Sequence, residues 1–135
     1  MRDKLTKKEI TDVSEEALVS YTTSRLMVEK GFPKIWGGYY HMEGGGLVAD
    51  RNPVDTDTPA IRLALLQNWL MKNHAYYVYP VSFGKKHWSY SIDRLGASAL
   101  LIVSCYNRQI YSDYTKAFEA GLVEALTLIK HMPRL

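Results

Sequence analysis

The order of apolar and polar positions predicts several short helices and strands along the chain. A first helix is predicted from about Tyr21 to Lys30, with Ser20 as its N-cap and Gly31 as the left-handed residue after its end. Residues 35–42 alternate as a strand, three glycines follow in the turn 43–46, and 47–49 returns as a second strand. Together the two strands predict a hairpin.

A second helix is predicted to begin at Thr58-Pro59, because Thr is a good N-cap and proline is favoured at the first helical position. It would run to about Asn73. Its apolar residues occupy two sides, with Leu63, Leu66 and Leu70 on one and Ile61, Leu65 and Trp69 on the other. A helix that is apolar nearly all round must be covered twice, by a sheet and by either another part of the chain or a second copy.

The second half of the chain predicts another hairpin, with strands over 75–81 and 87–92. Tyr77 and Tyr79 would lie on one face of its first strand, opposite Val78, because strand side chains alternate. The apolar stretch 97–103 is either a further strand or a buried connection, and the pattern alone does not separate these two. A last helix is predicted from about Tyr114 to Lys130, with Ser112 or Asp113 as its cap.

These elements predict an α+β fold with the order α-β-β-α-β-β-(β)-α. We expect an antiparallel sheet of four to five short strands, with about three helices packed mainly on one face. In the last helix, Ala117, Gly121 and Ala125 form a row of small residues that permits close backbone approach and favours packing on the sheet over a dimer seam. The length of 135 residues fits a single domain, 1–135, in which 1–18 either packs or forms a loosely attached segment.

Composition and charge indicate the compartment of the protein and the character of its surface. No run of 18 apolar residues is present, so no membrane span is predicted. The polar N-terminus lacks a secretory pattern and Cys105 is the single cysteine, which together predict a cytoplasmic protein. The 17 basic and 14 acidic residues are spread along the chain, as on an ordinary mixed-charge surface.

Five local patterns occur together in a distinctive order. They are Val19-Ser20-Tyr21 with Val28-Glu29-Lys30-Gly31-Phe32, then Tyr39-Tyr40, then Thr58-Pro59 with Trp69-Leu70 and His74, then Trp88-x-Tyr90-x-Ile92, and finally Tyr114-x-x-Ala117-x-x-Ala120-Gly121-Leu122 with Glu124-Ala125-Leu126 and Leu128-Ile129. With them, residues 18–131 resemble a family of small uncharacterised proteins of gut Bacteroidales and their phages and prophages. The resemblance implies a short α+β domain, a cytoplasmic bacterial or phage setting, and no established cofactor. The chain departs from the family pattern at Gly44-Gly45-Gly46 and in its apolar stretch 96–105.

Candidate chemistry is sparse. A catalytic zinc site needs three converging protein ligands, and the ligand-type residues here fall on separate elements. They are His41, Glu43, Asp55, Asp57, His74, His87 and His131. Cys105 follows an apolar run, as buried structural cysteines do. The acidic residues, Glu124 among them, occupy positions typical of solvated helix faces. No catalytic, cofactor or metal site is therefore predicted, and we lean against an enzyme.

The most suggestive feature is the mixture of aromatic and basic residues over 76–90. Sheet aromatics with nearby cations can bind single-stranded nucleic acid, although tyrosine is also an ordinary strand residue. The candidate interaction surface consists of Tyr77, Tyr79, Lys85, Lys86, His87 and Trp69. The leading hypothesis is a non-catalytic interaction or accessory protein of phage or mobile-element type that forms a homo-oligomer, most simply a dimer, with an unknown protein partner. Single-stranded nucleic-acid binding by 76–90 is the alternative, and a small hydrolase or metal enzyme is a third.

Overall fold

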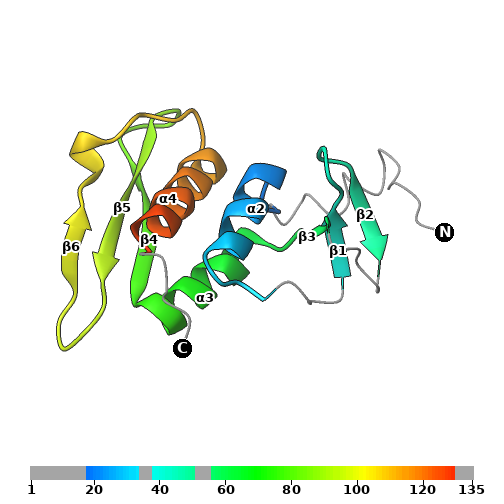
Figure 1. Ribbon diagram of the computed structural model, residues 1–135. Coiled ribbons are helices and arrows are strands. Elements are labelled where there is room, and N and C mark those ends of the chain that lie inside the picture. Colours follow the sequence, from blue (N-terminus) through cyan, green and yellow to red (C-terminus); the bar gives the residue numbers. More distant parts are fainter. Residues whose placement is uncertain (1–17, 34–37, 51–55, 130–135) are drawn as a thin grey trace. The chain divides into compact units, whose positions relative to one another are not determined.

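The computed structural model describes residues 18–33, 38–50 and 56–129, and divides the chain into two compact units, 1–62 and 63–135 (Figure 1). The described part contains three α-helices and two three-stranded antiparallel sheets, which confirms the α+β class. The prediction of one sheet of four to five strands is wrong, because each unit completes its own sheet with a third strand. Apart from Leu18, the N-terminal segment 1–18 lies outside the described residues.

The first unit contains helix α2, Tyr21–Glu29, which begins and ends as predicted. The side chain of Ser20 accepts a hydrogen bond from the backbone N–H of Thr23 at 3.3 Å, which is the N-cap contact. Gly31 adopts a φ of +109°, the left-handed conformation that glycine adopts without strain after a helix. Local turn and capping chemistry therefore fixes both ends of this helix.

The first sheet has the order β2-β1-β3, built from β1 (Gly38–His41), β2 (Leu47–Asp50) and β3 (Thr58–Pro59). The first two strands form the predicted hairpin, with Tyr40 opposite Val48. Thr58-Pro59 does not begin a helix, so that prediction is wrong. Proline is tolerated at the edge of a sheet, where its missing N–H leaves no ladder bond unmade, and here Pro59 lies opposite Tyr40.

The chain after β3 continues in an extended conformation before its next helix. The backbone N–H of Ala60 donates to the carbonyl oxygen of Tyr39 at 2.9 Å, and that of Val19 donates to the carbonyl oxygen of Ile61 at 2.8 Å. The hydroxyl of Ser24 in α2 donates to the carbonyl oxygen of Pro59. Residues 59–61 thus form hydrogen bonds with other parts of the first unit. The helix α3 begins only at Leu63, five residues after Thr58.

The second unit contains α3 (Leu63–His74), β4 (Tyr76–Ser82), β5 (Trp88–Arg94), β6 (Leu100–Val103), a short 3-10 turn η1 (Cys105–Asn107) and α4 (Tyr114–Leu128). Its sheet has the order β4-β5-β6. Strands β4 and β5 form the predicted hairpin, with Val78 opposite Ile92. The stretch 97–103 does include a strand, β6, and a bulge interrupts its pairing with β5 between Ile92 and Asp93.

Helix α4 packs on one face of β4 and β5 (Figure 1). Its N-cap is Asp113, whose carboxylate accepts a hydrogen bond from the backbone N–H of Lys116 at 2.8 Å. Ala117, Gly121 and Ala125 are all buried. A Cβ atom on Gly121 would lie 2.5 Å from Val78 Cγ1, so this row of small residues lies directly on the sheet, as predicted.

Helix α3 contacts both β4 and α4. Its buried residues are Leu63, Leu66, Gln67 and Leu70, which form a single stripe. Leu65 and Trp69 are partly exposed and Ala64 is exposed, so the described part of the chain covers the second apolar side of this helix only in part. No described helix is both long and apolar enough to cross a membrane.

Candidate interaction surface

Tyr77 and Tyr79 lie on the face of the β4-β5-β6 sheet that points away from α4. Because Val78 and Tyr90 contact Gly121 of α4, the period of two along a strand places Tyr77 and Tyr79 on the opposite face. Their rings stack with centroids 5.4 Å apart and an interplanar angle of 27°. Tyr77 is 40% exposed, so this part of the predicted surface is accessible.

A carboxylate lies beside this pair. The hydroxyl of Tyr79 donates to Asp93 Oδ1 at 3.2 Å, and Asp93 is directly opposite Tyr77 in the β4–β5 register. Burial and the hydrogen bond and charge of Asp93 raise the pKa of Tyr79. A negative charge at this position opposes a phosphate backbone, so the tyrosine face alone is a poor site for nucleic acid.

The basic residues of the candidate surface lie at one end of the hairpin. Lys85, Lys86 and His87 are exposed in the turn between β4 and β5, which is closed by a hydrogen bond from Phe83 N–H to the His87 carbonyl oxygen at 2.7 Å. Strands rise about 3.3 Å per residue, so these cations follow at least ~10 Å of strand beyond Tyr79. The aromatic and basic groups therefore form neighbouring patches on one hairpin.

Trp69 belongs to a different cluster. Its ring contacts that of His74 edge-on, with centroids 5.0 Å apart, and the His74 ring stacks on Tyr76 at 6.5 Å. Tyr76 shares the α4-facing side of β4 with Val78, so Trp69 lies across the sheet from the Tyr77–Tyr79 pair. Burial lowers the pKa of His74, which favours a neutral imidazole in this aromatic cluster. The six predicted residues thus do not form one surface.

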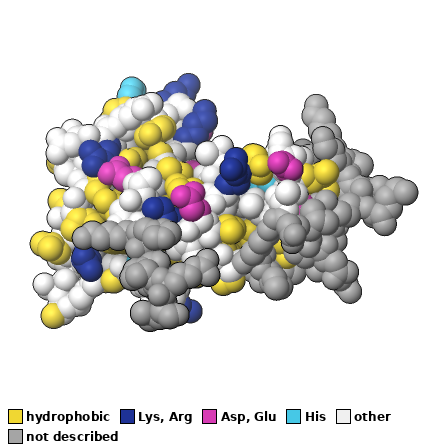
Figure 2. Space-filling model, viewed as in Figure 1, with side chains coloured by type: hydrophobic (Ala, Val, Ile, Leu, Met, Phe, Trp, Pro, Cys, Tyr) yellow, Lys and Arg dark blue, Asp and Glu magenta, His cyan; other side chains and the backbone are white. Residues whose placement is uncertain are grey.

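Strand β6, which sequence reasoning did not include in the surface, exposes three consecutive apolar side chains. Leu100, Leu101 and Ile102 are 63%, 53% and 39% exposed. Figure 2 shows hydrophobic side chains at the surface over β6, at the left edge of the view. Of the two alternatives for 97–103, the structure therefore has the further strand and not the buried connection. The run was visible in the sequence, but its exposure follows from its position at the sheet edge.

A second exposed aromatic contact lies near β6. The rings of Phe83, in the hairpin turn, and Tyr106, in η1, are tilted against each other with centroids 5.8 Å apart. Tyr106 is 83% exposed, which is unusual for a large aromatic side chain in a monomer. From Leu95 to Asn107 the chain carries no charged residue. An uncharged, apolar edge with exposed aromatics nearby is typical of a protein-binding surface.

The second unit also contains a partly buried polar network that the sequence did not reveal. Arg108 binds Glu124 through two nitrogens, Nε to Oε1 and Nη2 to Oε2, each at 2.6 Å. The hydroxyl of Tyr90 donates to the same Oε1. Glu124 was predicted to lie on a solvated helix face, and this is wrong, because the side chain is only 21% exposed and joins α4 to β5 and to the segment after η1.

The network perturbs all three groups. Burial alone would raise the pKa of Glu124, but the hydrogen bonds from Arg108 and Tyr90 outweigh it and lower that pKa. Burial, followed by the hydrogen bond to Glu124, raises the pKa of Tyr90, and the hydrogen bond to Glu124 raises the pKa of Arg108. Glu124 is therefore ionised and saturated with donors. Such a carboxylate stabilises the fold and is not available as a general base.

The residues considered for metal binding or nucleophilic catalysis are held apart or already engaged. His41 is buried, with Nε2 at 2.8 Å from the Val19 carbonyl oxygen, while Glu43 is exposed. Cys105 is buried, and neither His74 nor His87 forms a hydrogen bond with it. Among residues 18–33, 38–50 and 56–129, no group of three His, Cys, Asp or Glu side chains converges as a metal site. Asp57 is buried, and Asp55 and His131 lie outside the described residues.

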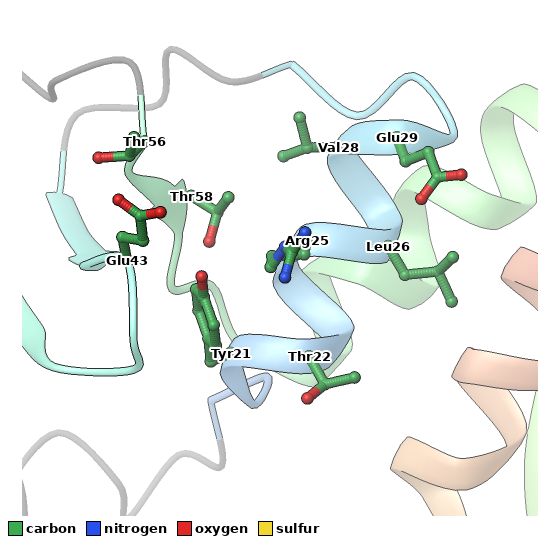
Figure 3. Close-up of a pocket in the computed structure, with 9 residues that line it drawn as sticks. All are labelled: Tyr21, Thr22, Arg25, Leu26, Val28, Glu29, Glu43, Thr56 and Thr58. Atoms are coloured by element: carbon green, nitrogen blue, oxygen red, sulfur yellow. The ribbon is translucent and has the colours of Figure 1, made fainter.

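The first unit contains an open pocket of about 650 Å³ beside α2 (Figure 3). Figure 3 shows Glu43, Thr56 and Thr58 on one side of the pocket and α2 on the other, with Tyr21 between them. The guanidinium of Arg25 lies over the Tyr21 ring, 5.7 Å from its centroid. Within the described ranges, no ion pair joins Arg25 to Glu43. The lining combines apolar side chains with threonine hydroxyls and groups of both charges, and it contains no activated nucleophile.

Comparison with known proteins adds no relative. No protein-family model matches the chain, and neither the curated proteins nor the solved structures contain a significant match.

Proposed function

We propose that this chain is a non-catalytic interaction protein that associates with itself, most simply as a dimer. The observation that carries the proposal is the exposed apolar edge strand β6, with Leu100 and Leu101 more than half exposed. Monomeric proteins seldom leave such an edge uncovered, because its unpaired backbone groups and apolar side chains promote association.

The state of the reactive side chains supports a non-catalytic role. Glu124 is bound by Arg108 and Tyr90, and Cys105 is buried, with its backbone N–H donating to the hydroxyl of Ser91 in β5. An active site needs a nucleophile or base that is accessible and within reach of its partner. Neither condition favours the small hydrolase or metal enzyme. A cytoplasmic setting and a role in a phage or mobile element are part of the proposal and rest on the sequence pattern and the family resemblance.

Light scattering coupled to gel filtration tests the proposal directly. Over a series of loading concentrations, we expect a mass of two chains, or a mass that rises toward it as concentration increases. A mass of one chain at every concentration, including the highest that stays soluble, would overturn the proposed self-association.

Single-stranded nucleic-acid binding through 76–90 is a second candidate, favoured by the exposed cations Lys85 and Lys86 on the hairpin that also carries the Tyr77–Tyr79 stack. Fluorescence anisotropy with labelled oligonucleotides at low salt would test it. Double substitution of Lys85 and Lys86 with Gln should weaken binding and reduce its salt dependence by about two phosphate contacts. Absence of binding to single strands of differing composition would end this candidate and leave self-association unaffected.

A further inference from the structure

We infer that strand β6 pairs antiparallel with β6 of a second copy of this chain, so that the two sheets continue into each other across a two-fold axis. This inference rests on the proposed self-association and names the surface that performs it. The β4-β5-β6 sheet has two edges, β4 and β6. The β4 edge is closed to a further strand, whereas the β6 edge is open.

The outer edge of β4 is closed by a side chain of α3. The side-chain oxygen of Gln67 accepts a hydrogen bond from the backbone N–H of Val78 at 3.0 Å, and its side-chain nitrogen donates to the Tyr76 carbonyl oxygen at 3.4 Å. Gln67 is 7% exposed, so these contacts are shielded from water. One side chain thus takes up a donor and an acceptor that an incoming strand would need.

Proline completes the protection of this edge. Pro80 lies two residues after Val78 in β4 and therefore has its backbone nitrogen on the same outer side of the strand. Proline has no N–H, so an added strand would find no donor there. Helix-borne capping and edge proline are two of the recognised means by which proteins prevent strands from pairing at an edge.

The edge at β6 has neither device. Within the described residues, no strand pairs with its outer side. It contains no proline and no charged residue, and its Leu100, Leu101 and Ile102 side chains are exposed. Its one irregularity is the bulge opposite Ile92 and Asp93, which neither adds a charge nor removes a backbone donor. The β4 edge is closed and the β6 edge is apolar and open. This difference indicates that β6 pairs with another strand.

The chemistry of β6 favours a second copy as the partner. Antiparallel pairing about a two-fold axis brings the same short segment of both copies together, so the segment must be compatible with itself. Each chain has a net charge of +3, so two copies repel each other overall. Residues 95–107 are uncharged, however, so pairing of β6 with β6 brings no like charges directly opposite each other. A partner selected by charge would instead require charged residues along the edge.

The test compares three proteins by sedimentation equilibrium: the unmodified chain, L101K and Q109K. Leu101 and Gln109 are both exposed, so each substitution adds one positive charge to the surface without disturbing the core. Lysine at position 101 places like charges close together at the seam and should weaken the dimer by about tenfold or more. Q109K, which adds the same charge outside β6, should dimerise within about twofold of the unmodified chain.

Hydrogen exchange gives an independent reading that does not rely on a variant. The outward-facing amides of residues 100–103 should exchange more slowly above the dimerisation concentration than below it, while the amides of β4 should not change. A dimer that L101K leaves intact, with unchanged exchange in β6, would overturn this inference and leave the proposed self-association standing. A protein that is monomeric at all concentrations would overturn both.

Discussion

Gly121 of α4 lies against the ring of Tyr90 in β5, so closely that a Cβ atom on Gly121 would be 2.9 Å from Tyr90 Cγ and 2.5 Å from Val78 Cγ1. No ordinary side chain fits at such distances. The contact explains why the sequence has Ala, Gly and Ala at intervals of four residues in this helix, and it brings Glu124, one turn further along, within reach of the Tyr90 hydroxyl.

Substitution of Gly121 with Ala should therefore destabilise the protein, although alanine is the better helix former. The methyl group would overlap Val78 and Tyr90, and overpacking of this kind costs about 1–3 kcal/mol. Urea unfolding measures the change. Gly96→Ala is the matched control, because the nearest atom to its new methyl group is 3.9 Å away, and a loss as large as that of Gly121→Ala would contradict the explanation.

Substitution of Tyr90 with Phe keeps the buried ring and removes only the hydroxyl that donates to Glu124. A hydrogen bond to a charged acceptor is worth about 1.5–3 kcal/mol, and Arg108 compensates in part, so we expect a loss of about 1–2 kcal/mol in the free energy of unfolding. Tyr79→Phe removes a hydroxyl that donates to Asp93. Tyr79 is half-buried, whereas Tyr90 is buried, so this variant should cost less. Equal losses of unfolding free energy in the two variants would show that the hydrogen bond to Glu124 contributes no more stability than the one to Asp93.

The same network predicts a stability that falls at both ends of the pH scale. The folded pKa of Glu124 is below its ordinary value of 4.5, so its contribution is present above that pH and is lost as the pH falls through the folded pKa. The folded pKa of Tyr90 is above its ordinary value of 10.0, so its contribution is present below pH 10 and is lost as the pH rises further. Thermal unfolding from pH 3 to 11 measures both limbs. Glu124→Gln should flatten the acid limb and Tyr90→Phe the alkaline limb, and unchanged limbs would refute the assignment.

Substitution of Gln67 with Leu should expose the importance of its contacts with β4. The Val78 amide would lose its acceptor in a buried position, at a cost of about 1–3 kcal/mol. Gln67→Glu retains the acceptor and loses the donor to Tyr76, so it separates the two contacts. Faster hydrogen exchange at the Val78 amide in the Leu variant is the direct measurement. Unchanged exchange at that amide would mean that another group, and not Gln67, protects it.

The features that sequence reasoning predicted correctly depend on neighbours in the chain. Ser20 and Gly31 determine the ends of α2 through contacts within four residues, and Asp113 does the same for the start of α4. The glycine turn after His41 predicts the first hairpin for the same reason. The prediction of a helix start at Thr58-Pro59 fails because this dipeptide suits a helix start and an edge strand equally well. Only its pairing with β1 decides between the two.

The features that could not be predicted depend on distant partners. Glu124 meets Arg108 across 16 residues and Tyr90 across 34, and nothing in the local sequence distinguishes it from a solvated glutamate. The sequence predicts Trp69 and Tyr77 in one surface, but Trp69 contacts His74, which stacks on Tyr76, and Tyr76 lies on the opposite face of β4 from Tyr77. The exposure of β6 likewise depends on the strand order, which the apolar pattern of 100–103 does not encode.

The hydrogen bonds from Gln67 and the position of Pro80 have a consequence for the size of any assembly. A sheet with two open edges adds copies at both ends and grows into a fibre, whereas a sheet with one open edge is finished after a single addition. With β4 closed and β6 open, two copies use up the pairing capacity of the β4-β5-β6 sheet. Gln67 would then limit the assembly to two chains by closing β4, although it lies on the edge of the sheet that is not part of the β6–β6 contact.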